Sequence, residues 1–152
     1  MSFDVFVQDL PPDSRTVEDI PDDFTPKPIG RRVDIVAGIL RVAPFADFAD
    51  PTWGKIDEPG FSIEINIGPA DILDSFAFHI RGGDEAMFVV ADILRELRLR
   101  AIAPGTVSGF FEITELGVAY AKWQVFRRQI VGQCQTPPQV NLTDVVRFVP
   151  DT

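Results

Sequence analysis

Alternation of apolar and polar residues predicts four β-strands in the first 103 residues of the chain. In the opening stretch, Phe3, Val5 and Val7 face one way and the residues between them face the other, which is typical of a half-buried strand. The second and third segments repeat this pattern and are close enough in the chain to form an antiparallel hairpin. The four segments are residues 2–8 (SFDVFVQ), 61–68 (FSIEINIG), 75–81 (SFAFHIR) and 99–103 (LRAIA).

Helical spacing of apolar residues predicts helices in residues 31–43 and 82–98, and a further helix in residues 114–131. The first two helices complete the order β-α-β-β-α-β, which is that of the ferredoxin-like fold. We therefore predict an α+β protein, a ferredoxin-like two-layer sandwich with an added C-terminal helix and an extended tail over residues 136–152. That fold class implies a sheet with the strand order 4-1-3-2.

The chain, residues 1–152, has the length of a single α+β domain. Residues 9–30 hold five of the 13 prolines and many acidic residues, which predicts a long surface loop because proline interrupts both helices and sheet ladders. Loops of this length in compact domains are uncommon and are often functional. A second loop, rich in aromatic residues, is predicted over residues 44–60, with turns at Asp50-Pro51 and Pro59-Gly60.

The charge of the chain narrows the classes of partner. Fourteen basic and 23 acidic residues give a formal net charge of −9. This charge repels phosphate backbones and anionic lipid, so we expect neither a nucleic-acid nor a membrane partner. It favours a basic protein partner, or it simply keeps the protein soluble. Cys134 is the only cysteine, which excludes an intrachain disulfide and a cysteine-based zinc site. With no signal peptide and no long apolar run, we expect a cytoplasmic protein without a cofactor or a metal.

Residues 81–88 (RGGDEAMF) carry the one short stretch that resembles a catalytic signature. The five letters from Arg81 to Glu85 resemble the motif of the GGDEF cyclases, which join two GTP molecules into a cyclic dinucleotide. In that family one residue separates the arginine from the first glycine, and a strand follows the motif, whereas here a helical pattern follows. We instead predict that Gly82 and Gly83 supply positive φ angles and that Asp84 caps the helix, with Glu85 in its first turn.

Polar residues on the outward positions of the predicted strands form the first candidate site. With both helices on one side of the sheet, these residues share its open face. Glu64 and His79 could act as a general acid/base couple there, and Arg81 could hold an anion. The alternative is a solvated sheet face with weak cross-strand pairs. The candidate ligand-binding residues are Asp4, Glu64, Asn66, His79 and Arg81.

Aromatic residues form the second candidate site. Phe45, Phe48 and Trp53 lie among acidic residues in the predicted aromatic loop, a setting that is typical of protein contacts, although they could equally fold back over the core. In the helix predicted at 114–131, an apolar stripe that includes Trp123 must also be buried. It could cover the open sheet face, or it could pack at the edge and leave that face for a homodimer.

The segments SFDVF, WG and FSIEIN are similar to those of small bacterial proteins of unassigned function that begin with the same strand. This resemblance implies a fold and a bacterial origin, but no activity. We expect a non-catalytic protein-binding module, with an immunity-type inhibitor of a basic toxin as one form. The alternative is a small-ligand-binding protein or an enzyme that uses the open face around Glu64, His79 and Arg81.

Overall fold

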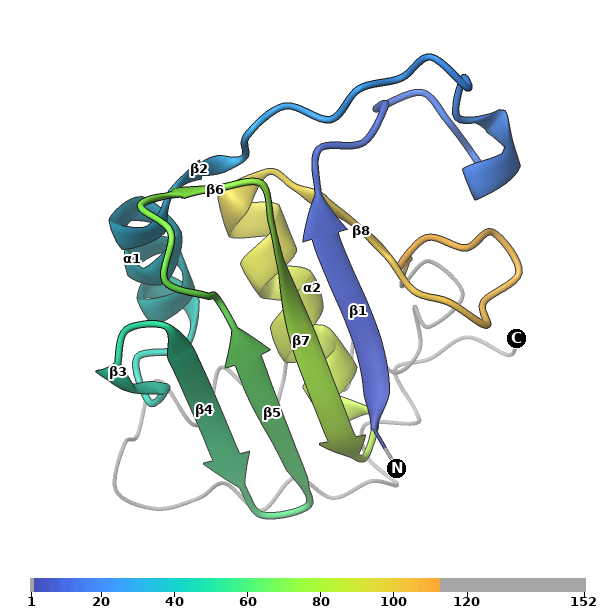
Figure 1. The fold of residues 1–152 in the computed structure, drawn as a ribbon. Helices are drawn as coiled ribbons and strands as arrows, with labels where there is room; N and C mark the ends of the chain where they lie inside the picture. The colour runs from blue at the N-terminus through green and yellow to red at the C-terminus, as the bar shows by residue number, and fades with distance from the viewer. Residues whose placement is uncertain (1, 113–152) are drawn as a thin grey trace. The chain divides into compact units, whose positions relative to one another are not determined.

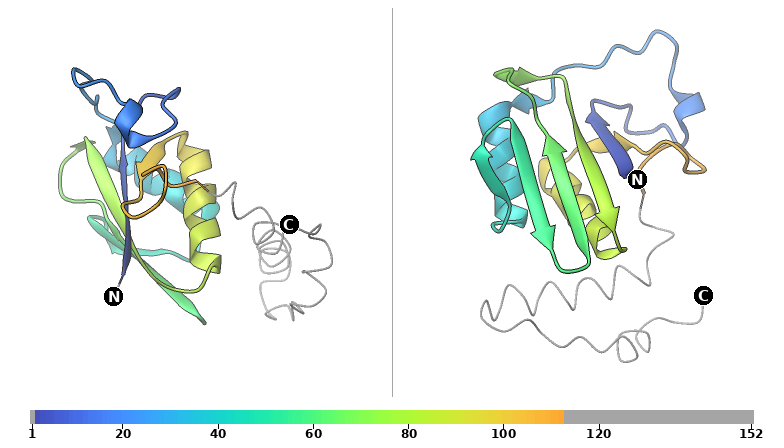
Figure 2. Two further views of the ribbon diagram at one scale, coloured as in Figure 1. Left: turned by 90° about the vertical axis from the view of Figure 1, so that its right-hand side faces the viewer. Right: turned by 60° about the horizontal axis from the view of Figure 1, so that its bottom comes forward.

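The computed structural model describes residues 2–112, which form a six-stranded antiparallel sheet with two helices packed on one of its faces (Figures 1 and 2). The helix predicted at 114–131 and the tail predicted at 136–152 lie outside the described residues. No helix in the described part of the chain is long and apolar enough to cross a membrane.

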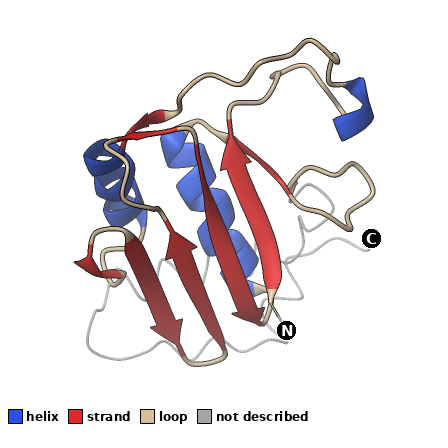
Figure 3. Cartoon of the chain, viewed as in Figure 1, coloured by secondary structure: helices blue, strands red, loops and turns tan. Residues whose placement is uncertain are grey.

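The main sheet has the strand order β3-β4-β5-β7-β1-β8, and a two-stranded sheet joins β2 and β6 (Figure 3). The strands are β1 (Phe3–Gln8), β2 (Gly30–Arg31), β3 (Asp47–Asp50), β4 (Trp53–Glu58), β5 (Phe61–Asn66), β6 (Ile72–Leu73), β7 (Ser75–Gly82) and β8 (Arg100–Ile102). The helices are the 3-10 helix η1 (Val17–Asp19), α1 (Arg32–Val42) and α2 (Glu85–Leu97).

The α+β class is confirmed, but the six-stranded sheet differs from the predicted four-stranded ferredoxin-like sheet. The four predicted strands are neighbours in the order β5-β7-β1-β8, and β3 and β4 extend the sheet beyond β5. Both added strands lie in the segment predicted as an aromatic loop. Its turns at Asp50-Pro51 and Pro59-Gly60 are present, but β4 has a weak apolar signal because Gly54 takes one of its inward positions. The ring of Phe48 fills the space beside Gly54.

The core lies between the inward face of the sheet and the two helices. Alternation buries every second residue along β5 and in the centre of β1. In β7 it buries Phe76, Phe78 and Ile80, with Ala77 buried as well, and α2 is buried along most of its length. The side chains that are almost fully buried include those of Val5, Val7, Ile39, Ile63, Ile65, Phe78, Ile80, Phe88, Val89 and Ile93. This packing fixes which residues remain on the opposite, open face of the sheet.

Local contacts hold the long loop, whose only helical segment is η1. A carboxylate oxygen of Asp9 accepts a hydrogen bond from the backbone N–H of Lys27 and ties the two ends of the loop together. The guanidinium of Arg100 donates to the carbonyl of Pro11 and lies over the ring of Phe110. These contacts place the first part of the loop beside β8.

The RGGDE stretch forms the junction between β7 and α2, and its geometry corrects one prediction. Gly82 has a φ of +102°, as predicted, but Gly83 does not have a positive φ. The prediction that Asp84 caps the helix is wrong, because Asp84 already has helical angles and its side chain makes no capping hydrogen bond. The backbone carbonyl of Gly83 accepts the N–H of Ala86 instead.

Gly82 should be intolerant of a side chain for two separate reasons. A Cβ at this position would lie 2.3 Å from the carbonyl oxygen of Gly60, and the positive φ is itself unfavourable for alanine. We expect Gly82→Ala to lower the free energy of unfolding by about 2–5 kcal/mol, the sum of about 1–2 for the backbone angle and about 1–3 for the clash. Urea denaturation would measure the change.

Gly68→Ala provides the matched control, since Gly68 has a φ of +85° but nothing within 4 Å of its hypothetical Cβ. Its loss should be limited to the backbone cost of about 1–2 kcal/mol. Equal losses in the two variants would contradict the close approach of Gly82 to Gly60.

Candidate functional site

The open face of the sheet carries a row of ionisable residues that lie opposite one another on four strands. Asp4 on β1 lies opposite His79 on β7, His79 lies opposite Glu64 on β5, and Glu64 lies opposite Lys55 on β4. Arg81 follows His79 on the same face of β7, two residues along the strand. Directly opposed residues have Cβ atoms about 4.5–5.5 Å apart, so their side chains can form hydrogen bonds across the strands.

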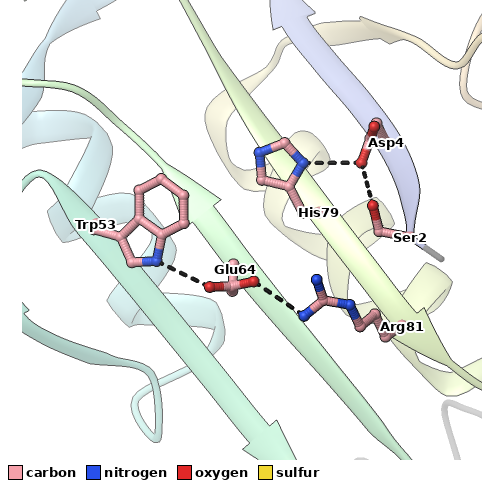
Figure 4. A network of polar contacts seen from close by, with 6 residues as sticks. All are labelled: Ser2, Asp4, Trp53, Glu64, His79 and Arg81. Carbon is pink, nitrogen blue, oxygen red and sulfur yellow. Dashed lines mark hydrogen bonds and ion pairs between the residues drawn. The ribbon is translucent and has the colours of Figure 1, made fainter.

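Asp4 and His79 form the first of two polar networks on this face (Figure 4). The imidazole Nδ1 lies 2.9 Å from Oδ1 of Asp4, and the hydroxyl of Ser2 donates to the same oxygen at 2.9 Å. The hydrogen bonds from His79 and Ser2 lower the pKa of Asp4 below its ordinary value, and so keep this carboxylate ionised. An ionised carboxylate only accepts hydrogen bonds, which places the imidazole proton on Nδ1 and leaves Nε2 as an acceptor while the ring is neutral.

The second network joins Glu64 to two donors (Figure 4). One carboxylate oxygen accepts the indole N–H of Trp53 at 3.3 Å, and the other accepts a guanidinium N–H of Arg81 at 3.2 Å. Both oxygens of Glu64 are therefore engaged. The carboxylate that hydrogen-bonds to His79 is Asp4, whereas the predicted couple was Glu64 with His79.

Trp53 connects the two networks. Its ring stacks on the imidazole of His79, with the ring centroids 6.2 Å apart and the planes at 24°. Trp53 belongs to this site because β4 joins the sheet next to β5 and places it on the open face. The alternation of WGKIDE is the sequence signal for this position, although the prediction places the stretch in a loop. Ser2 was likewise not among the predicted site residues.

The three aromatic residues predicted as protein contacts do not share one surface. Trp53 faces the open side of the sheet, whereas the ring of Phe48 lies against the inward position of Gly54. Phe45 lies in the turn between α1 and β3 with 40% of its surface exposed. Phe45 is therefore the member of the three that presents an aromatic surface outside the sheet.

A hollow of about 450 Å³ lies on the open face, at the end of the sheet where β1 ends and β7 begins. Its wall includes Phe6, which is 40% exposed. Its floor is Ala77, a small residue that leaves space between larger neighbours. The lining of the hollow includes Phe6, Gln8, Asn66, Ser75, Ala77 and Ile102.

The five predicted ligand-binding residues all lie on this face, but they form two separate groups. Asp4, Glu64, His79 and Arg81 form the two networks, while Asn66 lines the hollow. Among residues 2–112, no group of three or more histidine, cysteine or acidic side chains could hold a metal ion.

Comparisons of this chain with protein-family models, with curated proteins and with solved structures found no match.

The hydrogen bonds to Asp4 predict a pH-dependent contribution to stability. Because the pKa of Asp4 is lower in the folded protein than in the unfolded chain, its contribution is present above the ordinary value of 3.8 and is lost as the pH falls through the folded value. At pH 6, Asp4→Asn should cost about 0.5–1 kcal/mol, since the carboxylate is 41% exposed and is screened by solvent. The difference from wild type should shrink as the pH falls below 3.8.

Chemical denaturation at pH 6, 4 and 2 would measure this difference. Asp57→Asn serves as the control, because Asp57 is an exposed carboxylate on the same face that makes no side-chain hydrogen bond within residues 2–112. A cost for Asp4→Asn that stays constant down to pH 2 would show that the carboxylate does not stabilise the fold through its charge.

Proposed function

We propose that this protein is a non-catalytic protein-binding module and that the open face of its sheet is the contact surface. The observation that carries the proposal is the hollow beside the exposed ring of Phe6, with the two polar networks next to it. Protein interfaces commonly combine a central apolar pocket with a rim of polar and charged groups. The face has both parts in one continuous area.

The shape of the hollow favours a protein over a small molecule as the ligand. Small-molecule sites bury about 70–90% of the ligand surface, which requires walls on several sides. This hollow lies on the outer face of a sheet, with Ala77 as its floor and the Phe6 ring standing half-exposed at its side. A side chain of a partner protein would be covered from the other side by the partner itself.

Pairing of a partner strand with the sheet edges is disfavoured in the described part of the chain. The outer side of β8 is occupied, since Ile102 bridges to Phe110 and the carbonyl of Ala101 accepts the N–H of Phe111. At the other edge, β3 is acidic and irregular, and the carboxylate of Asp47 accepts the backbone N–H of Ala49. Short, charged and irregular edges are the usual protection against added strands. This leaves the open face as the more suitable contact surface.

The charge of the chain supports a basic partner. The net charge of −9 would speed the approach of a cationic protein and would make its association sensitive to salt. An inhibitor of a basic toxin would meet this description, as would any other basic protein. The charge therefore predicts a basic partner, and it does not distinguish a toxin from another basic protein.

Phe6 and Phe45 allow a matched test, because each is 40% exposed and the two lie on different candidate surfaces. We expect Phe6→Ser to reduce capture of the natural partner from lysate at least tenfold, since it removes the wall of the hollow. Phe45→Ser should leave capture unchanged. Quantitative affinity capture at low and high salt, with both variants checked for an unchanged unfolding midpoint, provides the measurement.

The reverse result, in which Phe45→Ser abolishes capture and Phe6→Ser does not, would move the contact surface to the turn before β3. If neither substitution affects a specifically captured partner, both surfaces are excluded and the proposal fails.

The Asp4–His79 pair supports a second function, in which this face binds or transforms a small molecule. A carboxylate that holds Nδ1 of an imidazole orients the ring and leaves Nε2 to exchange a proton with a ligand. Within residues 2–112, Nε2 has no hydrogen-bond partner. The ring of Trp53 stacked on the imidazole gives a ligand an additional flat surface.

A thermal-shift screen with metabolites would test this second function. A compound that uses His79 should raise the Tm of the wild type by a few degrees and should lose most of this effect with His79→Gln. Lys55→Gln is the control, since Lys55 lies in the same row of residues but two strands away from His79. A screen without any His79-dependent compound would exclude a small-ligand role for the pair.

A further inference from the structure

We infer that the open face recognises an extended peptide segment of its partner, with an apolar side chain in the hollow and a lysine or arginine two residues away that meets Asp4. This inference rests on the proposed function and adds the chemistry of the ligand. Three observations support it: the uncharged lining of the hollow, the spacing between the hollow and Asp4, and an unused oxygen of the Asp4 carboxylate.

The polar residues that line the hollow are all uncharged. Gln8, Asn66 and Ser75 contribute two side-chain amides and one hydroxyl, and within residues 2–112 none of these groups makes a hydrogen bond. Amide and hydroxyl groups offer both donors and acceptors, which match the N–H and C=O groups of a peptide backbone. Asn66 and Ser75 are exposed and Gln8 is half-buried, so a peptide would replace water at these groups.

The apolar part of the lining suits one side chain of moderate size. Phe6 and Ile102 are directly opposed on β1 and β8, and Phe6 is opposed to Ala77 on its other side. Two large side chains next to a small one leave a depression that an apolar side chain can fill. Burial of such a side chain contributes about 1.5–3 kcal/mol, which makes it the anchor of the peptide.

The spacing along β1 connects this anchor to Asp4. Phe6 and Asp4 are alternate residues of one strand on the same face, so they are separated by about 7 Å. An extended peptide that runs along β1 has the same spacing between its own alternate side chains. A peptide residue over the hollow therefore places the residue two positions away over Asp4.

The carboxylate of Asp4 has the capacity to bind a cation. His79 and Ser2 both hydrogen-bond to Oδ1, and within residues 2–112 no hydrogen bond or ion pair is made to Oδ2, although the charge of Arg81 also acts on this carboxylate. The same two hydrogen bonds lower the pKa of Asp4 and keep it negatively charged. Glu64 is less suitable, since Trp53 and Arg81 occupy both of its oxygens. A basic side chain on the partner would thus meet Asp4.

Selection from displayed random 12-residue peptides against the full chain would test the inference. Enriched peptides should share an apolar residue with lysine or arginine two positions before or after it. Their binding should weaken at least tenfold with Phe6→Ser. Asn66→Ala, at an exposed position that the fold does not require, should weaken binding about threefold or more. Phe45→Ser should leave it unchanged.

The contribution of Asp4 is tested separately. With Asp4→Asn, binding should weaken three- to tenfold, and replacing the selected basic residue by glutamine should then have no further effect. Asp57→Asn, on the same face, should preserve the preference for the basic residue. Enriched peptides without the spaced basic residue, or with equal affinity for wild type and Asp4→Asn, would overturn the inference.

Failure of the inference and failure of the proposed function give different results. If no peptide is enriched, or the enriched peptides bind Phe6→Ser as well as wild type, the peptide-recognition inference is wrong. If the natural partner is nevertheless lost with Phe6→Ser, the open face remains the contact surface and the partner presents a folded surface to it. If neither peptides nor partner depend on Phe6, both proposals fail.

Discussion

Strand β7 is paired along its length with β1 on one side and β5 on the other, and this double pairing positions the whole candidate site. The register is held by the inward residues of β7, since Phe76, Phe78 and Ile80 are all buried. A shift of one residue would expose these side chains and would turn His79 into the core. The energy that buries the apolar face therefore also places His79 between two carboxylates on the polar face.

The alternation of side chains along the strands also makes one face of the sheet apolar and the other polar. Side chains alternate along each strand, so the helices can cover the apolar face while the other face keeps its polar residues. On that open face, the hydrogen bonds of Glu64 and Asp4 orient side chains that would otherwise be mobile. The hollow arises where Ala77 is too small to fill the space beside Phe6.

Most of the fold described in residues 2–112 could be predicted from local patterns. The alternation in β1, β5 and β7 and the helical spacing in α1 and α2 reflect the burial of one face, and burial dominates the energy of these elements. Prediction failed where a segment has little apolar signal. Strand β4 has a glycine, Gly54, at one inward position, and the ring of Phe48 fills the space beside it. The place of β4 in the sheet therefore depends on a contact between two segments and not on its own apolar residues. The cap expected from Asp84 failed because the helical angles begin at this residue.

The sequence by itself determined that Asp4, Glu64, His79 and Arg81 lie on one face of a sheet, because side-chain alternation is a local property of each strand. Only the tertiary structure decided which of them interact. His79 has Asp4 on one side and Glu64 on the other, and the outcome depends on where β1, β4 and β5 stand relative to β7. Hydrogen-bond ladders between segments distant in the chain set these positions at about 4.8 Å from strand to strand. For this reason Trp53 reaches Glu64, and Glu64 pairs with Arg81 and not with His79, which local sequence does not determine.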